Sequence, residues 1–132
     1  MKIKRLDHIV LTVSDLAQAE RFYHEVFDMP VIKDQTTEDV ITLRCGHQLI
    51  RLRKADKDSD LRANNQTIGA ADICIVSGDK MSDIENKGVS PLKSYFVNIV
   101  AGPMTKMGSE GEMTSIYLRD YDQNLIEIST YK

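Results

Sequence analysis

The feature that most constrains this chain is an internal repeat that runs from one end to the other. The stretch HIVLTVSD (8–15) aligns with DICIVSGD (72–79), and QLIRLRK (48–54) aligns with NLIEIST (124–130). A repeat of about half the chain indicates two copies of one supersecondary unit, because each copy alone buries too little apolar surface. The sequence therefore predicts two similar modules that pair around a pseudo-twofold axis.

Each copy of the repeat predicts the same order of elements: a strand, a helix and three further strands. In the first copy, Asp15 caps a helix over about residues 16–27. In the second copy, Asp79 takes the capping role before a helix over about residues 80–87, which ends at Gly88. The later strands are VIKDQ, DVITLRC and HQLIRLRK in the first copy, and SYFVNIVAG, EMTSIYLRD and NLIEISTY in the second.

This order of elements predicts an α+β fold class, in which two βαβββ modules form one curved mixed sheet. Module 1 covers residues 1–62 and module 2 covers residues 67–132, and a polar linker joins them into a single domain. The segment GPMTKMGSEGE (102–112) lies between two predicted strands of module 2. It is either a mobile flap over a site or a plain hairpin connection.

Charge and composition exclude several classes of partner. The chain has 132 residues and a formal net charge of −3, and its basic cluster RLRKADK (51–57) is typical of a solvated strand end, so no nucleic-acid partner is expected. No run approaches the ~18 apolar residues of a membrane span, so no membrane partner is expected either. Cys45 and Cys74 lack C-x-x-C spacing and are interpreted as reduced packing residues. We therefore expect a soluble, cytoplasmic protein.

Ionisable residues interrupt the apolar strands at positions that the repeat makes equivalent. Strand alternation places His8 on the sheet face away from the predicted helix, and its repeat partner is Asp72. Glu127 interrupts the last strand, and its repeat partner is Arg51. Isolated buried charges are costly and persist only when they are paired or bound to a metal. Taken alone, His8 fits a hydrogen-bonded core histidine and Glu127 fits a salt bridge to Arg51, but the shared placement favours a functional site.

Three motifs carry a resemblance to a known family. They are LDHIVLTVSDLAQAERFYHEVFDM at the start, GAADICIV at the midpoint and SIYLRDYDQNLIEIST at the end. With these motifs the chain resembles the vicinal oxygen chelate superfamily, the group of glyoxalases, bleomycin resistance proteins and dioxygenases. The resemblance implies paired βαβββ modules that form a cup-shaped sheet, a homodimer, and a divalent metal ion in the cup.

The resemblance also implies roles for individual residues. The first metal ligand of the family falls on His8, and its C-terminal glutamate ligand, also the catalytic residue, falls on Glu127. The ligand of the second module, usually histidine, falls on Asp72, which is a departure from the family pattern. The remaining ligand position falls on Arg51, which cannot bind a metal because it stays protonated. His8, Asp72 and Glu127 would form a facial triad for Mn, Zn, Ni, Fe or Mg.

Two functions from different classes remain open. In the first, the metal polarises two adjacent substrate oxygens, and the chain is a lyase, isomerase or transferase of the glyoxalase type that acts on a small polar molecule. Arg51 would bind an anionic group of the substrate. Tyr117 and Arg119 share one face of the penultimate strand and would either line the cup or pack against the partner subunit. In the second, Arg51 supplies the positive charge in a metal-free cup, paired with Glu127 and Asp72. The chain would then be a non-catalytic protein that sequesters a small molecule.

Overall fold

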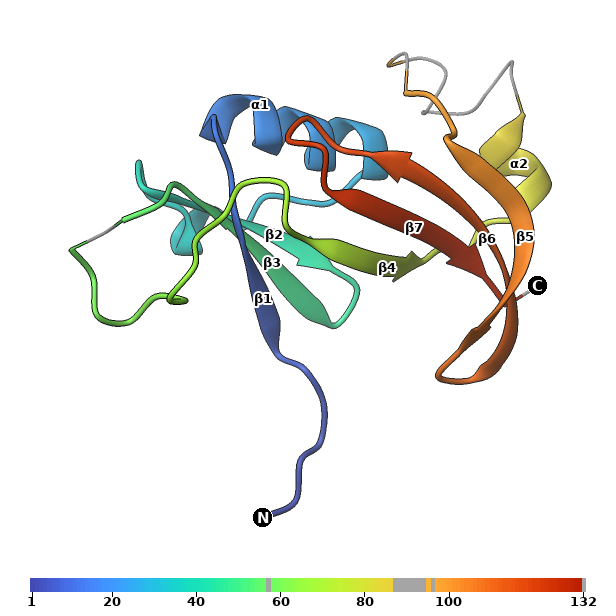
Figure 1. The fold of residues 1–132 in the computed structure, drawn as a ribbon, viewed down its shortest axis with the longest axis horizontal. Coiled ribbons are helices and arrows are strands. Elements are labelled where there is room, and N and C mark those ends of the chain that lie inside the picture. The colour runs from blue at the N-terminus through green and yellow to red at the C-terminus, as the bar shows by residue number, and fades with distance from the viewer. Residues whose placement is uncertain (57, 87–94, 96, 132) are drawn as a thin grey trace. The chain divides into compact units, whose positions relative to one another are not determined.

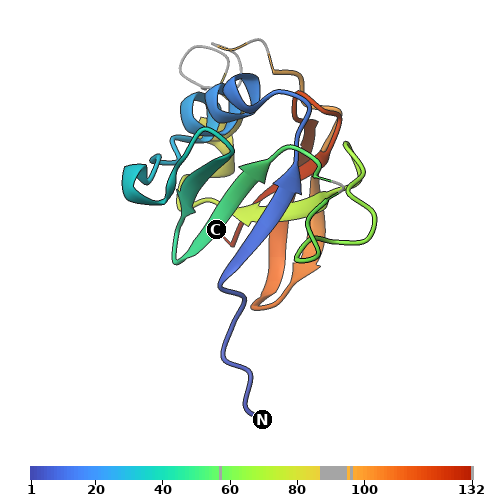
Figure 2. The ribbon, with the colours of Figure 1, turned by 90° about the vertical axis from the view of Figure 1, so that its left-hand side faces the viewer.

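The computed structural model describes residues 1–56, 58–86, 95 and 97–131 (Figure 1). The chain divides into two compact units, Met1–Gly69 and Ala70–Lys132, and each unit has its own β-sheet. The segment before the first strand extends away from the sheet of its unit (Figure 2). None of the described helices is long and apolar enough to cross a membrane.

The first unit contains three strands and one main helix. Its sheet has the order β1-β3-β2, in which β1 runs parallel to β3 and β2 runs antiparallel to β3. Val31 extends the sheet by an isolated antiparallel bridge to Leu43 in β2. The elements are β1 (His8–Thr12), α1 (Leu16–Arg21), the π-helical turn η1 (Phe22–Val26), the 3-10 turn η2 (Lys33–Gln35), β2 (Val40–Cys45) and β3 (Gln48–Arg53).

Helix α1 begins at the predicted cap and covers one face of this sheet. The Asp15 carboxylate accepts a hydrogen bond of 2.9 Å from the backbone N–H of Gln18, which satisfies a donor that the first helical turn leaves unpaired. Alternate strand residues point toward the helix and form the core with its apolar side. The buried members of this core include Leu11, Val13, Ala19, Tyr23, Val26, Ile41, Leu43, Ile50 and Leu52.

The second unit repeats this plan with a longer hairpin. Its sheet has the order β4-β7-β6-β5, in which β4 runs parallel to β7 and the other neighbours are antiparallel. Ile116, Leu118 and Ile126 are fully buried in its core. The elements are β4 (Asp72–Val76), α2 (Met81–Glu85), β5 (Ala101–Gly108), β6 (Gly111–Arg119) and β7 (Leu125–Thr130).

The strand register of the two units is the same. In unit 1 the parallel pair β1 and β3 matches His8 with Leu49 and Val10 with Arg51. In unit 2 the parallel pair β4 and β7 matches Asp72 with Leu125 and Cys74 with Glu127. His8 and Asp72 therefore take equivalent places, as do Arg51 and Glu127. The predicted α+β fold of two repeated βαβββ modules is confirmed, with the second strand of the first module reduced to the bridge at Val31.

One predicted strand of the first copy is wrong. Of VIKDQ, only Val31 pairs with another strand, and Lys33–Gln35 forms the 3-10 turn η2. Two threonine side chains account for this local structure. Their hydroxyls donate to backbone carbonyls that would otherwise accept hydrogen bonds from a neighbouring strand. The Thr36 hydroxyl donates to the carbonyl of Ile32 (2.8 Å), and the Thr42 hydroxyl donates to the carbonyl of Gln35 (2.7 Å).

The second copy also departs from the sequence prediction. Most of the segment 102–112 belongs to β5 and β6, so it is a hairpin of the sheet and not a flap. Nearly every side chain of β5 is exposed, so this edge strand has no apolar alternation that would predict it. Asp79 does not cap α2, since the N-cap is Lys80 and makes no side-chain hydrogen bond. The predicted stop at Gly88 and part of the strand SYFVNIVAG lie outside the described residues.

Candidate functional site

His8 lies on the face of the unit 1 sheet opposite to α1, and its ring has a defined orientation. Its Nδ1 lies 2.8 Å from Oδ1 of Asp7, and its Nε2 lies 3.3 Å from Nη1 of Arg51. A guanidinium can only donate, so Nε2 is the acceptor and the ring proton resides on Nδ1. Nδ1–H then donates to Oδ1 of Asp7. The hydrogen bond from His8 is the main cause that lowers the pKa of the Asp7 carboxyl below its ordinary value.

The side chain of Arg51 is held by two neutral acceptors. Besides His8, its Nη2 donates to Oε1 of Gln35 at 3.0 Å. Thr42, the residue of β2 that pairs with Arg51, positions Gln35 in turn. The Thr42 hydroxyl donates to the backbone carbonyl of Gln35. Among the described residues, no carboxylate forms a salt bridge with Arg51. We call Asp7, His8, Gln35 and Arg51 the Arg51 cluster; it orients the guanidinium without a direct salt bridge, and the Asp7 carboxylate lies near enough for the charge of Arg51 to help lower its pKa.

Glu127 is the end point of a hydrogen-bonded chain on the unit 2 sheet. The Ser129 hydroxyl donates to Oε2 of Glu127 at 3.2 Å, because a carboxylate can only accept. Ser129 Oγ lies 2.6 Å from the hydroxyl of buried Ser115 and 3.2 Å from the thiol sulfur of Cys74. Since Ser129 has used its one proton on Glu127, Ser115 donates to Ser129. Glu127, Ser129, Ser115 and Cys74 form the Glu127 network.

Tyr117 extends this network from the neighbouring strand. It pairs with Glu127 in the register of β6 and β7. Burial raises the pKa of its phenol above the ordinary value, and the charge of Glu127 and a hydrogen bond to it act in the same direction. The ammonium of Lys106 lies 5.9 Å from the centre of the Tyr117 ring, within the range of a cation–π contact.

The other predicted site residues of unit 2 have different surroundings. Asp72 is exposed at the first position of β4, and its charge contributes to the raised pKa of Tyr117. Arg119 is exposed and donates to the carbonyl of Gln123 at 3.3 Å, which ties it to the turn before β7. The structure therefore associates His8 with Arg51 in unit 1 and Glu127 with Tyr117 in unit 2. Asp7, Gln35 and Ser115 also contribute to these contacts, but no sequence pattern indicates them, because their contacts depend on turns and on side-chain orientation.

The divalent metal ion that the family resemblance implies requires a group of closely spaced ligands. Across the residues that the structure describes, no three histidine, cysteine, aspartate or glutamate side chains gather closely enough to hold a metal ion. The bond from His8 Nδ1 to Asp7 matches the carboxylate–histidine arrangement that orients metal-binding imidazoles. The lone pair of Nε2, however, is directed at the Arg51 guanidinium, whose fixed charge repels a cation. The Arg51 cluster is thus better suited to an anion than to a metal.

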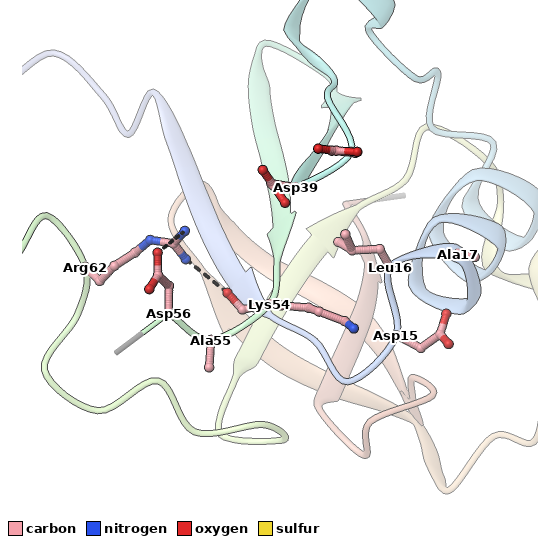
Figure 3. A pocket seen from close by; sticks show the side chains of 9 residues that line it. Asp15, Leu16, Ala17, Asp39, Lys54, Ala55, Asp56 and Arg62 are labelled. Carbon is pink, nitrogen blue, oxygen red and sulfur yellow. Dashed lines mark hydrogen bonds and ion pairs between the residues drawn. The ribbon is translucent and has the colours of Figure 1, made fainter. Parts of the chain in front are cut away.

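Unit 1 also has an open cavity with a volume of about 590 Å³ at the start of α1 and the end of β3 (Figure 3). Most of its walls are polar, and Lys54 extends across it toward Asp15 in the close-up view. A binding pocket of this size is normally lined mainly by apolar side chains, so we assign no function to this cavity. Its lining residues are Asp15, Leu16, Ala17, Glu38, Asp39, Lys54, Ala55, Asp56 and Arg62.

The pKa of the Cys74 thiol depends on the charge of Glu127, and this dependence can be tested. Burial raises its pKa, the charges of Glu127 and Asp72 raise it further, and the hydrogen bond with Ser129 acts in the opposite direction. In a Cys45→Ser background, Glu127→Gln should therefore lower the pKa of Cys74 and increase its thiolate fraction at pH 8. We expect alkylation by iodoacetamide to become about two- to fivefold faster.

The matched control for this measurement is Glu112→Gln, which removes the same charge from an exposed position of β6. It should leave the alkylation rate unchanged. A rate in Glu127→Gln that equals the control would show that Glu127 does not act on Cys74.

Comparison with known proteins agrees with the repeated fold. The chain matches the glyoxalase/bleomycin resistance protein/dioxygenase superfamily over residues 5–128. It is 37% identical over 131 residues to a virulence protein of Salmonella typhimurium, across 99% of this chain and 87% of that protein. It is 32% identical over 132 residues to a glyoxalase domain-containing protein of Mycosarcoma maydis, across 100% of this chain and 71% of that protein.

Solved structures show the same relationship. An integron cassette protein from the mobile metagenome of V. cholerae is 37% identical, with a TM-score of 0.88 over 100% of this chain and 98% of that one. A lactoylglutathione lyase of Agrobacterium tumefaciens (21% identical, 98% and 96% covered) and an antibiotic-binding protein of Streptomyces (18% identical, 98% and 98% covered) both have a TM-score of 0.72 and share the fold alone. By its sequence match and its fold, the chain belongs to the glyoxalase/bleomycin resistance protein/dioxygenase superfamily.

Proposed function

We propose that the chain binds a small molecule with an anionic group, and that Arg51 binds this group. The observation that carries the proposal is the state of the Arg51 guanidinium, which is held by His8 and Gln35 but has no salt-bridge partner among the described residues. Of its five N–H donors, two are used by these neutral acceptors, so enough remain for a bidentate bond to a carboxylate or phosphate. The antibiotic-binding protein with the same fold supports small-molecule binding as a function of this architecture.

Arg51→Gln tests this proposal. Wild-type protein should bind butyrate, a small monocarboxylate, in a calorimetric or NMR titration at constant ionic strength. The variant should bind it at least about tenfold more weakly, because a hydrogen-bonded charge pair is lost.

The control is Arg21→Gln, which removes the same charge from an exposed residue of α1 paired with Glu25. It should keep the wild-type affinity. Absence of saturable binding by the wild type, or equal binding by Arg51→Gln, would refute the proposal.

A metal-dependent enzyme is the second candidate function, and the Asp7–His8 pair favours it. In this version His8, Asp72 and Glu127 would hold the metal ion, which would be Mn, Zn, Ni, Fe or Mg. Arg51, Tyr117 and Arg119 would contact the substrate. The metal would polarise adjacent oxygens of a small polar substrate, as in a lyase, isomerase or transferase of the glyoxalase type. Glu127 is then both a ligand and the catalytic residue, and its proton donors Ser129 and Tyr117 would tune its basicity.

Metal content separates the two candidates. The enzyme version predicts stoichiometric metal, measured by mass spectrometry after incubation with Mn²⁺, Zn²⁺, Ni²⁺ and Fe²⁺, that is lost in both His8→Ala and Glu127→Ala. Wild-type protein that binds butyrate but takes up none of the four ions would leave only the metal-free binding function.

We also propose that the chain is a cytoplasmic homodimer. Both cysteines are free thiols, which supports a reducing compartment. Ile3 and Leu6 are 79% and 72% exposed on the N-terminal segment, and such apolar residues support contact with a second copy. Light scattering at micromolar concentration tests the dimer, and a monomer mass would contradict it.

A further inference from the structure

Arg53 carries a charge for which the structure shows no partner. It follows Arg51 by two residues in β3, so both side chains lie on the same face of the sheet. Its Nε is buried and has no hydrogen-bond partner, and no described residue forms a salt bridge with its guanidinium. Buried polar atoms are almost always paired, so an orphaned donor of this kind indicates a missing acceptor.

The surroundings of Arg53 add positive charge. Arg62 and Arg51 lie near enough for their charges to lower the pKa of Arg53, although burial is the larger cause. The Arg62 side chain is only 15% exposed, and it donates to the carbonyl of Lys54 at 3.1 Å (Figure 3). Its nearest carboxylate, Asp56, lies 4.0 Å away, at the limit of an ion pair. Arg62 thus has one weakly paired acidic group, Asp56, and Arg51 has the Asp7 carboxylate nearby, whereas no carboxylate pairs with Arg53 among the described residues.

We propose that Arg53 forms a second anion subsite beside Arg51, and that the ligand is a small molecule with two anionic groups, such as a short dicarboxylate. The inference rests on the proposed function, since it assigns the second group of the same ligand. Residues two apart in a strand are separated by roughly 6.5–7 Å between Cα atoms, so flexible arginine side chains can reach both ends of such a ligand. Arg62 strengthens the field at this subsite without using a donor of Arg53.

The experiment compares succinate with butyrate. Both have four carbons, but succinate carries two negative charges and butyrate carries one. At constant ionic strength wild-type protein should bind succinate about tenfold more tightly than butyrate, through a second charge-assisted pair. Arg53→Gln should weaken succinate binding to the level at which wild-type protein binds butyrate. Arg21→Gln, the charge-matched control on α1, should change neither affinity.

A second readout is specific to each residue. The ¹⁵N–¹H signal of Arg53 Nε, identified by its loss in Arg53→Gln, should shift on addition of succinate and not of butyrate, whereas Arg51 Nε should respond to both. Equal affinities for succinate and butyrate, or an Arg53 Nε signal that does not shift with succinate, would contradict the second subsite. The proposed function would still hold if butyrate binding depended on Arg51. Failure of wild-type protein to bind either probe would overturn both.

Discussion

We expect the Asp120→Ala variant to lose about 3–5 kcal/mol of unfolding free energy, because it removes three hydrogen bonds to one buried carboxylate. Asp120 is 5% exposed and closes the turn between β6 and β7. Its Oδ1 accepts from the backbone N–H groups of Asp122 and Asn124, both at 2.9 Å, and its Oδ2 accepts from Nδ2 of Asn124 at 2.8 Å. Alanine would leave the donors of Asn124, itself 1% exposed, buried and unpaired.

The effect should extend to two strands. The side-chain Oδ1 of Asn124 accepts from the backbone N–H of Ala71, directly before β4, at 2.8 Å. Gln123, in the same turn, has a φ of 70°, a conformation that a non-glycine residue keeps only when its surroundings enforce it. Asp120 thus stabilises the start of β7 and the residue before β4, and with them the strands that carry Glu127 and Cys74.

Urea denaturation measures this prediction. Asp120→Asn should lose less than the alanine variant, because its oxygen still accepts from the two backbone donors while its amide faces the Nδ2 of Asn124. Asp79→Ala is the surface control, since Asp79 is exposed and does not cap a helix. A stability of Asp120→Ala within about 1 kcal/mol of this control would contradict the assigned role.

The repeat predicted the fold because apolar alternation and core packing act on both copies alike. A slip of one residue in a strand would move its buried side chains to the solvent face, so the register is strongly determined. The same register places His8 opposite Leu49 and Asp72 opposite Leu125, and gives Arg51 and Glu127 matching positions. The pattern could therefore select these four residues without knowledge of any contact.

The contacts of the candidate site could not be predicted in the same way. Gln35 reaches Arg51 from a 3-10 turn whose shape depends on Thr36 and Thr42, and neither the turn nor the contact has a periodic signal. The basic stretch RLRKADK looked like a solvated strand end because its charges suggest exposure. In the structure the Nε of Arg53 is buried. Composition does not predict which atoms of a long charged side chain are buried and which are exposed.

The position of Arg51 has a consequence for the superfamily fold in this chain. Its repeat partner Glu127 is a carboxylate and accepts a hydrogen bond from Ser129. Arg51 instead donates hydrogen bonds to His8 and Gln35. The two equivalent positions thus differ in charge and in the direction of their hydrogen bonds. Glu127 is therefore an acceptor of hydrogen bonds and Arg51 a donor, and this difference supports the proposal of an anionic ligand for unit 1.

Gly102→Ala should destabilise the protein by about 2–4 kcal/mol, the second of the two largest effects we expect. Gly102 has a φ of 92°, in the region that side chains disfavour, and it lies at a register shift between β5 and β6. A Cβ built there would be 2.5 Å from the carbonyl oxygen of Ser115 and 3.1 Å from Cα of Ile116. Both atoms belong to the backbone of a central strand, so neither can move without disturbing the sheet.

Two glycines allow the strain and the clash to be measured separately. Gly46 has a φ of 60° but nothing within 4 Å of a built Cβ, so Gly46→Ala should cost only the conformational strain, about 1 kcal/mol. Gly78 has neither a positive φ nor an atom within 4 Å of a built Cβ, so Gly78→Ala should leave the free energy of unfolding nearly unchanged. If Gly102→Ala costs no more than Gly46→Ala, the contact with Ser115 is not limiting. If it costs more, displacement of Ser115 should also alter the Glu127 network, and the alkylation rate of Cys74 should change in the same variant.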